Sequence, residues 1–161
     1  MKPATQEIYV WLEKHDIHYT QHDHRAVFTV DEAATIEEDI PGIHAKTLLV
    51  RGEKTGSFFL VSLEGSKKLE QPRIKKLVGE RVRFAKPEDL ERILHVTPGS
   101  VSPLGLIFDT ELNISSYIID QDILESDIVT WHPNNNTQTL EFTQDAFQKI
   151  LQLLPHKTLT Y

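Results

Sequence analysis

The sequence predicts an α+β fold in one domain over residues 1–161, with a mixed, curved, barrel-like β-sheet flanked by short helices. Short apolar runs of strand type alternate with short amphipathic segments along the chain, in no regular βαβ order. No linker, internal repeat or low-complexity segment separates them, and 161 residues suit a single continuous core.

The most clearly predicted element is a β-hairpin. Two apolar runs, residues 46–51 and 57–62, flank a polar connection that contains Gly52 and Gly56, a pattern typical of two antiparallel strands. Further strands are expected at residues 18–22, 81–85, 106–109, 114–119, 128–131 and 137–142.

The helices are predicted from capping residues and apolar spacing. Thr29 with Glu32 forms a capping-box pattern for a short helix that should end before the turn signal Pro41-Gly42. Thr143 is expected to cap a closing amphipathic helix. Its core-facing residues would be Phe147, Ile150, Leu151 and Leu154. Other helices are expected at residues 5–15, 70–78 and 87–95.

Composition excludes several classes of function. Cysteine is absent, which removes disulfides, thiolate metal sites and cysteine nucleophiles. No apolar run approaches the ~18–20 residues of a membrane span, and no secretory h-region is visible, so we expect a cytoplasmic protein without a membrane partner. The net charge of −7 argues against broad, non-specific binding to DNA or other nucleic acid.

Positive charge is concentrated in one stretch of the chain. Residues 67–86 carry eight basic and two acidic side chains, a charge of +6 against −13 for the remainder. Such a segment can face phosphate groups, or it can be the solvated face of a helix. The residues expected to contact nucleic acid under the first interpretation are Lys67, Lys68, Arg73, Lys75 and Lys76.

Lys46 is the first candidate for chemistry. It opens a strand that becomes apolar at once, so its ammonium group should lie at the edge of the sheet above the core. A lysine there can hold a phosphate or polarise a carbonyl as a point charge. It can equally be a strand-end lysine that reaches for solvent.

A second candidate is the segment Pro98-Gly99-Ser100-Val101-Ser102-Pro103-Leu104-Gly105. Its two prolines and two glycines predict a tightly turned loop whose backbone N–H and C=O groups can bind a ligand directly. Ser100 or Ser102 could be a nucleophile, but the sequence shows no base arranged beside either hydroxyl. A purely structural bend is the alternative.

His132 is the third candidate, at a strand end that runs into a polar turn. An imidazole there can donate or accept a proton near neutral pH, or it can simply satisfy backbone groups of the turn. The remaining histidines show no zinc-protease motif such as H-E-x-x-H. We therefore expect no metal site.

Three features in order form a recognisable set: the lysine at the strand start in His44-Ala45-Lys46-Thr47-Leu48, the Gly99–Pro103 loop, and the segment Trp131-His132-Pro133-Asn134-Asn135. Together they resemble the YbaK / prolyl-tRNA-editing superfamily. Within it, Val82-Arg83-Phe84-Ala85, the loop and the His-Pro-Asn turn are most similar to the stand-alone PrdX or ProXp-ala type. The resemblance extends over nearly the whole chain.

The resemblance implies a YbaK-like fold and hydrolysis of an aminoacyl ester at the 3′ end of tRNA, without metal or organic cofactor. It implies that Lys46 is the key residue, near the terminal adenosine, and that Gly99, Ser100, Val101, Ser102 and Pro103 hold the aminoacyl group. His132 is included among the substrate-binding residues. The expected partner is tRNA, specifically tRNA for proline carrying alanine, and prolyl-tRNA synthetase is a second candidate partner.

One position departs from the family pattern. Relatives of this type usually have asparagine after the lysine, whereas this chain has Thr47, whose single hydroxyl differs from an amide in reach and donor number. Two other classes of function stay open: a non-catalytic module that binds an amino acid or aminoacyl-tRNA, and an enzyme that forms a Schiff base through Lys46.

Overall fold

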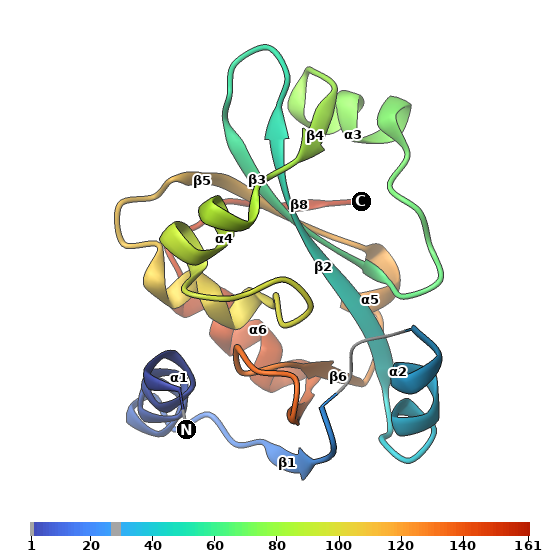
Figure 1. The fold of residues 1–161 in the computed structure, drawn as a ribbon, viewed down its shortest axis with the longest axis vertical. Helices are drawn as coiled ribbons and strands as arrows, with labels where there is room; N and C mark the ends of the chain where they lie inside the picture. Colours follow the sequence, from blue (N-terminus) through green and yellow to red (C-terminus); the bar gives the residue numbers. More distant parts are fainter. Residues whose placement is uncertain (1, 27–29) are drawn as a thin grey trace.

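The computed structural model describes residues 2–26 and 30–161. Its strands form one open, mixed sheet in the order β1-β7-β6-β2-β3-β5-β8, with β4 paired to β2 beside this path (Figure 1). The strands are β1 (Thr20–Asp23), β2 (Ile43–Gly52), β3 (Phe58–Glu64), β4 (Val82–Phe84), β5 (Ile114–Ile119), β6 (Ile128–Trp131), β7 (Gln138–Thr143) and β8 (Thr158–Thr160).

The long central strand β2 joins two parts of this sheet. At its start, Ile43 and His44 pair in parallel with β6. From Ala45 to Arg51 the strand pairs antiparallel with β3, and Val50 to Gly52 also pair with β4. Strand β2 therefore changes partners between His44 and Ala45, and the candidate site lies at this change.

Short helices cover the sheet. They are α1 (Pro3–Lys14), α2 (Val30–Glu37), α3 (Gln71–Val78), α4 (Pro87–Leu94), α5 (Gln121–Leu124) and α6 (Gln144–Leu153), with a 3₁₀ helix η1 (Pro103–Phe108). In Figure 1, α2 lies beside the first residues of β2. None of the helices in the described residues has both the length and the apolar character needed to cross a membrane.

Two apolar clusters pack on opposite faces of β2 and β3. The larger one takes Leu49 from β2 together with residues of α1, α4 and α6, and Ala45 packs against it. The smaller one takes Val50 from β2 and is covered by Ile74 of α3. Because side chains alternate along a strand, odd-numbered residues of β2 face the larger cluster and even-numbered residues face the smaller one.

The α+β prediction with a mixed sheet and short flanking helices is confirmed, and the predicted hairpin is β2 and β3. The closing helix begins as expected, because Thr143 Oγ1 accepts a hydrogen bond from the Ala146 amide. The sheet is not closed into a barrel, since its strands form an open path, so the barrel-like prediction holds only for its curvature. The proposed cap Thr29 lies outside the described residues.

The strand expected at residues 106–109 is wrong, because residues 106–108 belong to η1 and Asp109 caps its end. Pro103 begins this helix, and Ser102 caps it by accepting a hydrogen bond from the Leu104 amide at 3.2 Å. A Cβ on Gly105 would lie 3.2 Å from the Leu94 Cβ, so the glycine allows η1 to pack closely on α4. Helix α5 and strand β8 were not predicted.

Candidate functional site

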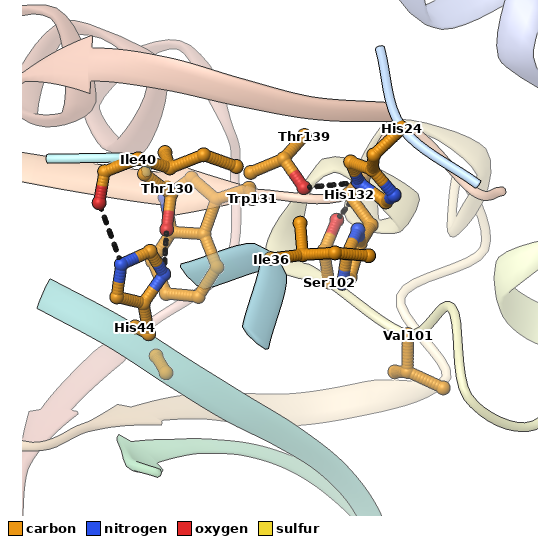
Figure 2. Close-up of a pocket in the computed structure, with 11 residues that line it drawn as sticks. His24, Ile36, Ile40, His44, Val101, Ser102, Thr130, Trp131, His132 and Thr139 are labelled. Carbon is orange, nitrogen blue, oxygen red and sulfur yellow. Dashed lines mark hydrogen bonds between the residues drawn. The ribbon is translucent and has the colours of Figure 1, made fainter. Parts of the chain in front are cut away.

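A small cavity opens where the start of β2 meets the end of β6 and the loop before η1 (Figure 2). Its volume is about 50 Å³, whereas one water needs about 10–15 Å³, so it has room for a group of only a few heavy atoms. Eleven residues line it: His24, Ile36, Ile40, His44, Ala45, Val101, Ser102, Thr130, Trp131, His132 and Thr139. The lining combines an apolar surface with three imidazoles and several hydroxyls.

His132 and His24 form one side of this cavity. Their ring centroids are 6.3 Å apart, in an edge-on arrangement. His132 Nδ1 lies 2.9 Å from the Gln138 backbone oxygen. His24 Nε2 lies 2.9 Å from Thr139 Oγ1 (Figure 2). A carbonyl oxygen can only accept, so Nδ1 of His132 carries the proton and Nε2 has the lone pair.

The pKa of His132 is lowered below the ordinary value of 6.5. Burial is the largest cause, and the neighbouring His24 and His44 add to it, while the hydrogen bond to the Gln138 carbonyl opposes the shift. The ring is therefore neutral at pH 7, with a lone pair on Nε2 that can accept a proton.

The turn after β6 holds His132 in place through several tethers. Thr5 of α1 donates to the Pro133 oxygen at 2.8 Å. Asn134 has a positive φ of 57° and donates from Nδ2 to the backbone oxygens of Leu94 and His95. Because these tethers reach α1 and the end of α4, the position of His132 is fixed by the fold rather than by the turn alone.

His44 forms the opposite side, at the point where β2 changes partners. Its Nε2 lies 2.9 Å from the Ile40 backbone oxygen, so this nitrogen carries the proton. Its Nδ1 lies 3.4 Å from Thr130 Oγ1, a weaker contact (Figure 2). Among the described residues, no group of three or more histidine, cysteine, aspartate or glutamate side chains is placed to hold a metal ion.

The loop at residues 99–103 contributes Val101 and Ser102 to the cavity lining. Gly99 has a φ of 92°, in the left-handed region, and is exposed, with open space where a Cβ would lie. Ser102 Oγ donates to the His132 backbone oxygen at 2.6 Å, so its proton is directed to a carbonyl and not to a base. The buried Ser100 does not line the cavity.

Lys46 and Thr47 lie next to the cavity without lining it. Lys46 is half-buried in β2, and no hydrogen bond or ion pair engages its ammonium group among the described residues. Because side chains alternate along a strand, Lys46 lies on the same face of β2 as Leu48 and Val50, opposite Ala45. Thr47 shares the face of Ala45 and is hydrogen-bonded to Ser62.

The basic residues of 67–76 have different environments. Lys67 Nζ lies 2.9 Å from Asp120 Oδ1 and 2.8 Å from Asp122 Oδ2, so its positive charge is already paired. The guanidinium carbon of Arg73 lies 4.1 Å from the Tyr161 ring centroid. Lys68, Lys75 and Lys76 are exposed, which leaves their ammonium groups accessible to a partner.

Sequence reasoning did not identify most of the cavity lining. His24, His44, Thr130 and Thr139 come from separate elements, and no local pattern links them. The available signal was the position of His44 at the start of the clearest predicted strand, two residues before Lys46.

Comparison with known proteins identifies the family. A model of the aminoacyl-tRNA editing domain matches residues 24–150. The prolyl-tRNA editing protein ProX of Acetoanaerobium sticklandii is 26% identical over 150 residues, which cover 92% of this chain and 91% of the relative. A prolyl-tRNA synthetase associated domain-containing protein 1 from Xenopus laevis is 28% identical over 156 residues, covering 94% and 92%.

The fold has also been seen in solved structures. The solved structure of a candidate trans-editing enzyme for prolyl tRNA synthetase superposes on this chain with a TM-score of 0.75 and 24% sequence identity. The match covers 99% of this chain and 97% of the other. The region matched by the family model includes every residue that lines the cavity. This chain therefore belongs to the aminoacyl-tRNA editing domain family.

Proposed function

We propose that the protein hydrolyses the ester bond of amino acids wrongly attached to tRNA, acting in trans, with alanyl-tRNA(Pro) as its substrate. The observation that carries this proposal is the cavity of about 50 Å³ that combines a neutral histidine with an apolar surface. Membership of the editing family supports the reaction class, and the names of the relatives support proline tRNA.

The size of the cavity supports a small aminoacyl group. A methyl side chain has room among Ala45, Val101 and the isoleucines of α2 and of the turn after it, and we propose that these side chains exclude larger groups. Steric exclusion of a larger group is the selection that a pocket performs well, since rejecting a smaller one through weaker packing gains only ~1–3 kcal/mol per methylene.

In the reaction, His132 is the proposed general base. Water attacks the ester carbonyl carbon and transfers a proton to Nε2 of His132. The bond to the ribose oxygen then breaks, and this oxygen takes the proton from Nε2 of His132 as it leaves, which releases the amino acid and free tRNA and restores the neutral base. An aminoacyl ester is already activated, so positioning and modest base assistance supply the acceleration.

We assign Lys46 to the nucleic-acid end of the substrate rather than to the amino acid. Its half-buried ammonium group is without an ion pair among the described residues, and β2 carries it next to the cavity but on the opposite face. A cation in this position can hold the phosphate of the terminal adenosine or stabilise charge that develops near the ester. The exposed Lys68, Lys75 and Lys76, with Arg73, are the proposed contacts to the rest of the tRNA.

The deciding experiment is a deacylation panel in which the purified chain is mixed with tRNA(Pro) carrying alanine, serine, cysteine or proline. We expect rapid loss of alanine and no loss of proline beyond the uncatalysed rate. Adding prolyl-tRNA synthetase tests whether it delivers the substrate. Tight binding of the aminoacyl-tRNAs without turnover would reject the enzyme and support a binding module.

A further inference from the structure

A chain of three hydroxyl groups runs from the core of the protein to Thr47. Thr47 and Ser62 are paired across β2 and β3, with 2.8 Å between Oγ1 and Oγ, and Ser62 Oγ lies 2.7 Å from the Tyr117 hydroxyl oxygen. Tyr117 and Ser62 have no exposed surface, whereas Thr47 keeps partial exposure. The chain therefore ends at the one member that a ligand can reach.

The direction of these hydrogen bonds follows from the number of protons. Each hydroxyl has one proton to donate. If Ser62 donated to Tyr117, the phenol proton would stay in the core with no acceptor among the described residues, which is unfavourable for a buried donor. Burial also raises the pKa of Tyr117 above its ordinary range, so the phenol keeps its proton. Tyr117 therefore donates to Ser62, and Ser62 donates to Thr47.

This arrangement leaves the Thr47 proton without a partner in the described part of the chain. Thr47 lies on the same face of β2 as Ala45, which lines the cavity, and two residues of strand span about 6.6 Å. Its free proton is therefore held one side-chain position beyond the cavity, where the remainder of a ligand that fills the cavity would extend.

We propose that Tyr117 and Ser62 are positioning residues that orient the Thr47 hydroxyl as a fixed hydrogen-bond donor to an oxygen of the aminoacyl-adenosine end of tRNA. The identity of this ligand rests on the proposed function. Without the chain, the Thr47 hydroxyl would rotate freely and its proton would be shared with water. When Ser62 donates to the Thr47 oxygen, one lone pair of that oxygen is occupied, and this restricts the directions in which the Thr47 proton can point.

A double-mutant cycle tests the chain. Thr47→Val removes the donor with little change of shape, and Tyr117→Phe removes the first member. We expect kcat/KM for alanyl-tRNA(Pro) to fall at least about 10-fold in Thr47→Val, about 2- to 10-fold in Tyr117→Phe, and less than about 3-fold in Thr47→Ser, which keeps the hydroxyl. In the Thr47→Val background, Tyr117→Phe should have no further effect.

Equal effects of Tyr117→Phe in both backgrounds would overturn the proposal, because the tyrosine would then act independently of Thr47. Tyr161→Phe is the matched control. Tyr161 is also buried, and its hydroxyl accepts a hydrogen bond from the Glu70 amide, outside the chain of hydroxyls. Its loss should leave deacylation unchanged, and thermal melting establishes that all variants are folded.

Binding of the non-hydrolysable amide analogue 3′-alanylamino-adenosine, measured by calorimetry, separates this proposal from the proposed function. Weaker binding in Thr47→Val and Tyr117→Phe, in a protein that deacylates nothing, would support the chain and reject the hydrolase. Identical binding by wild type and both variants would overturn the chain even in an active enzyme. Absence of both turnover and analogue binding would overturn both proposals.

Discussion

The side chain of His132 and the backbone oxygen of Gln138 lie 2.9 Å apart across the turn that joins β6 to β7. This contact fixes the ring proton on Nδ1 and leaves the Nε2 lone pair available. Two short strands therefore determine the tautomer of the histidine at the cavity, and none of the described residues supplies a carboxylate partner to its ring.

The first prediction concerns pH. Since the pKa of His132 lies below 6.5, the base is neutral above that value and kcat/KM should be flat from about pH 7 to 8. Activity should fall about tenfold per unit once the pH passes below the lowered pKa. His132→Gln should lose most activity and also this acid limb, as measured in a pH series of single-turnover deacylation. Persistence of the same limb in His132→Gln would assign the titration to another group.

The second prediction concerns Lys46. Lys46→Ala should lower kcat/KM for alanyl-tRNA(Pro) by about 10²-fold or more, the scale expected when a charge at an ester or its adjoining phosphate is removed. Lys14→Ala removes an exposed lysine of α1, outside the proposed tRNA contacts, and should change kcat/KM by less than about 3-fold. Circular dichroism establishes that both variants are folded. Near wild-type turnover in Lys46→Ala would remove this residue from the mechanism.

The third prediction concerns the exposed basic residues. Replacing Lys68, Lys75 and Lys76 with glutamine should weaken tRNA binding and reduce the slope of log K against log salt by about 0.7–0.9 for each phosphate that the variant no longer neutralises. The control replaces Lys14, Lys149 and Lys157, three exposed lysines elsewhere, with the same change in net charge. If both triple variants reduce the slope equally, the effect belongs to net charge and not to a binding surface.

A fourth prediction separates the roles of the loop residues. Ser102→Ala and Ser100→Ala should each retain more than about a tenth of the activity, because the Ser102 proton is donated to a backbone carbonyl. Gly99→Val should reduce activity by distorting the loop, since a φ of 92° is unfavourable for valine by about 1–2 kcal/mol, and not by filling the cavity. Complete loss in either folded serine variant would indicate a serine nucleophile instead.

The elements that were predicted correctly are those with a strong local signal. The β2–β3 hairpin is two contiguous apolar runs around a polar turn, and Thr143 caps α6 with its own side chain. Residues 106–109 were misjudged because their apolar run is helical only through the Ser102 cap and the packing of Gly105 on α4.

The lining of the cavity was predicted only where a motif marks it. The loop and His132 were found because glycine, proline and histidine occur together in short segments. His24 and Thr139 are 115 residues apart and meet only because the end of β1 lies beside β7, a pairing that no local periodicity encodes. Likewise, the paired state of Lys67 depends on Asp120, which is 53 residues away.

The change of partners along β2 has a consequence for how this domain tolerates insertions. His44 is in register with β6, and Lys46 and Thr47 are in register with β3. If one extra residue were inserted between His44 and Lys46, β2 could stay in register with both β6 and β3 only by forming a bulge. Without a bulge, it would exchange the inward and outward side chains of one half, turning Thr47 away from Ser62 and Lys46 toward the larger cluster. The length of this strand is therefore as strict a requirement as the identity of its residues.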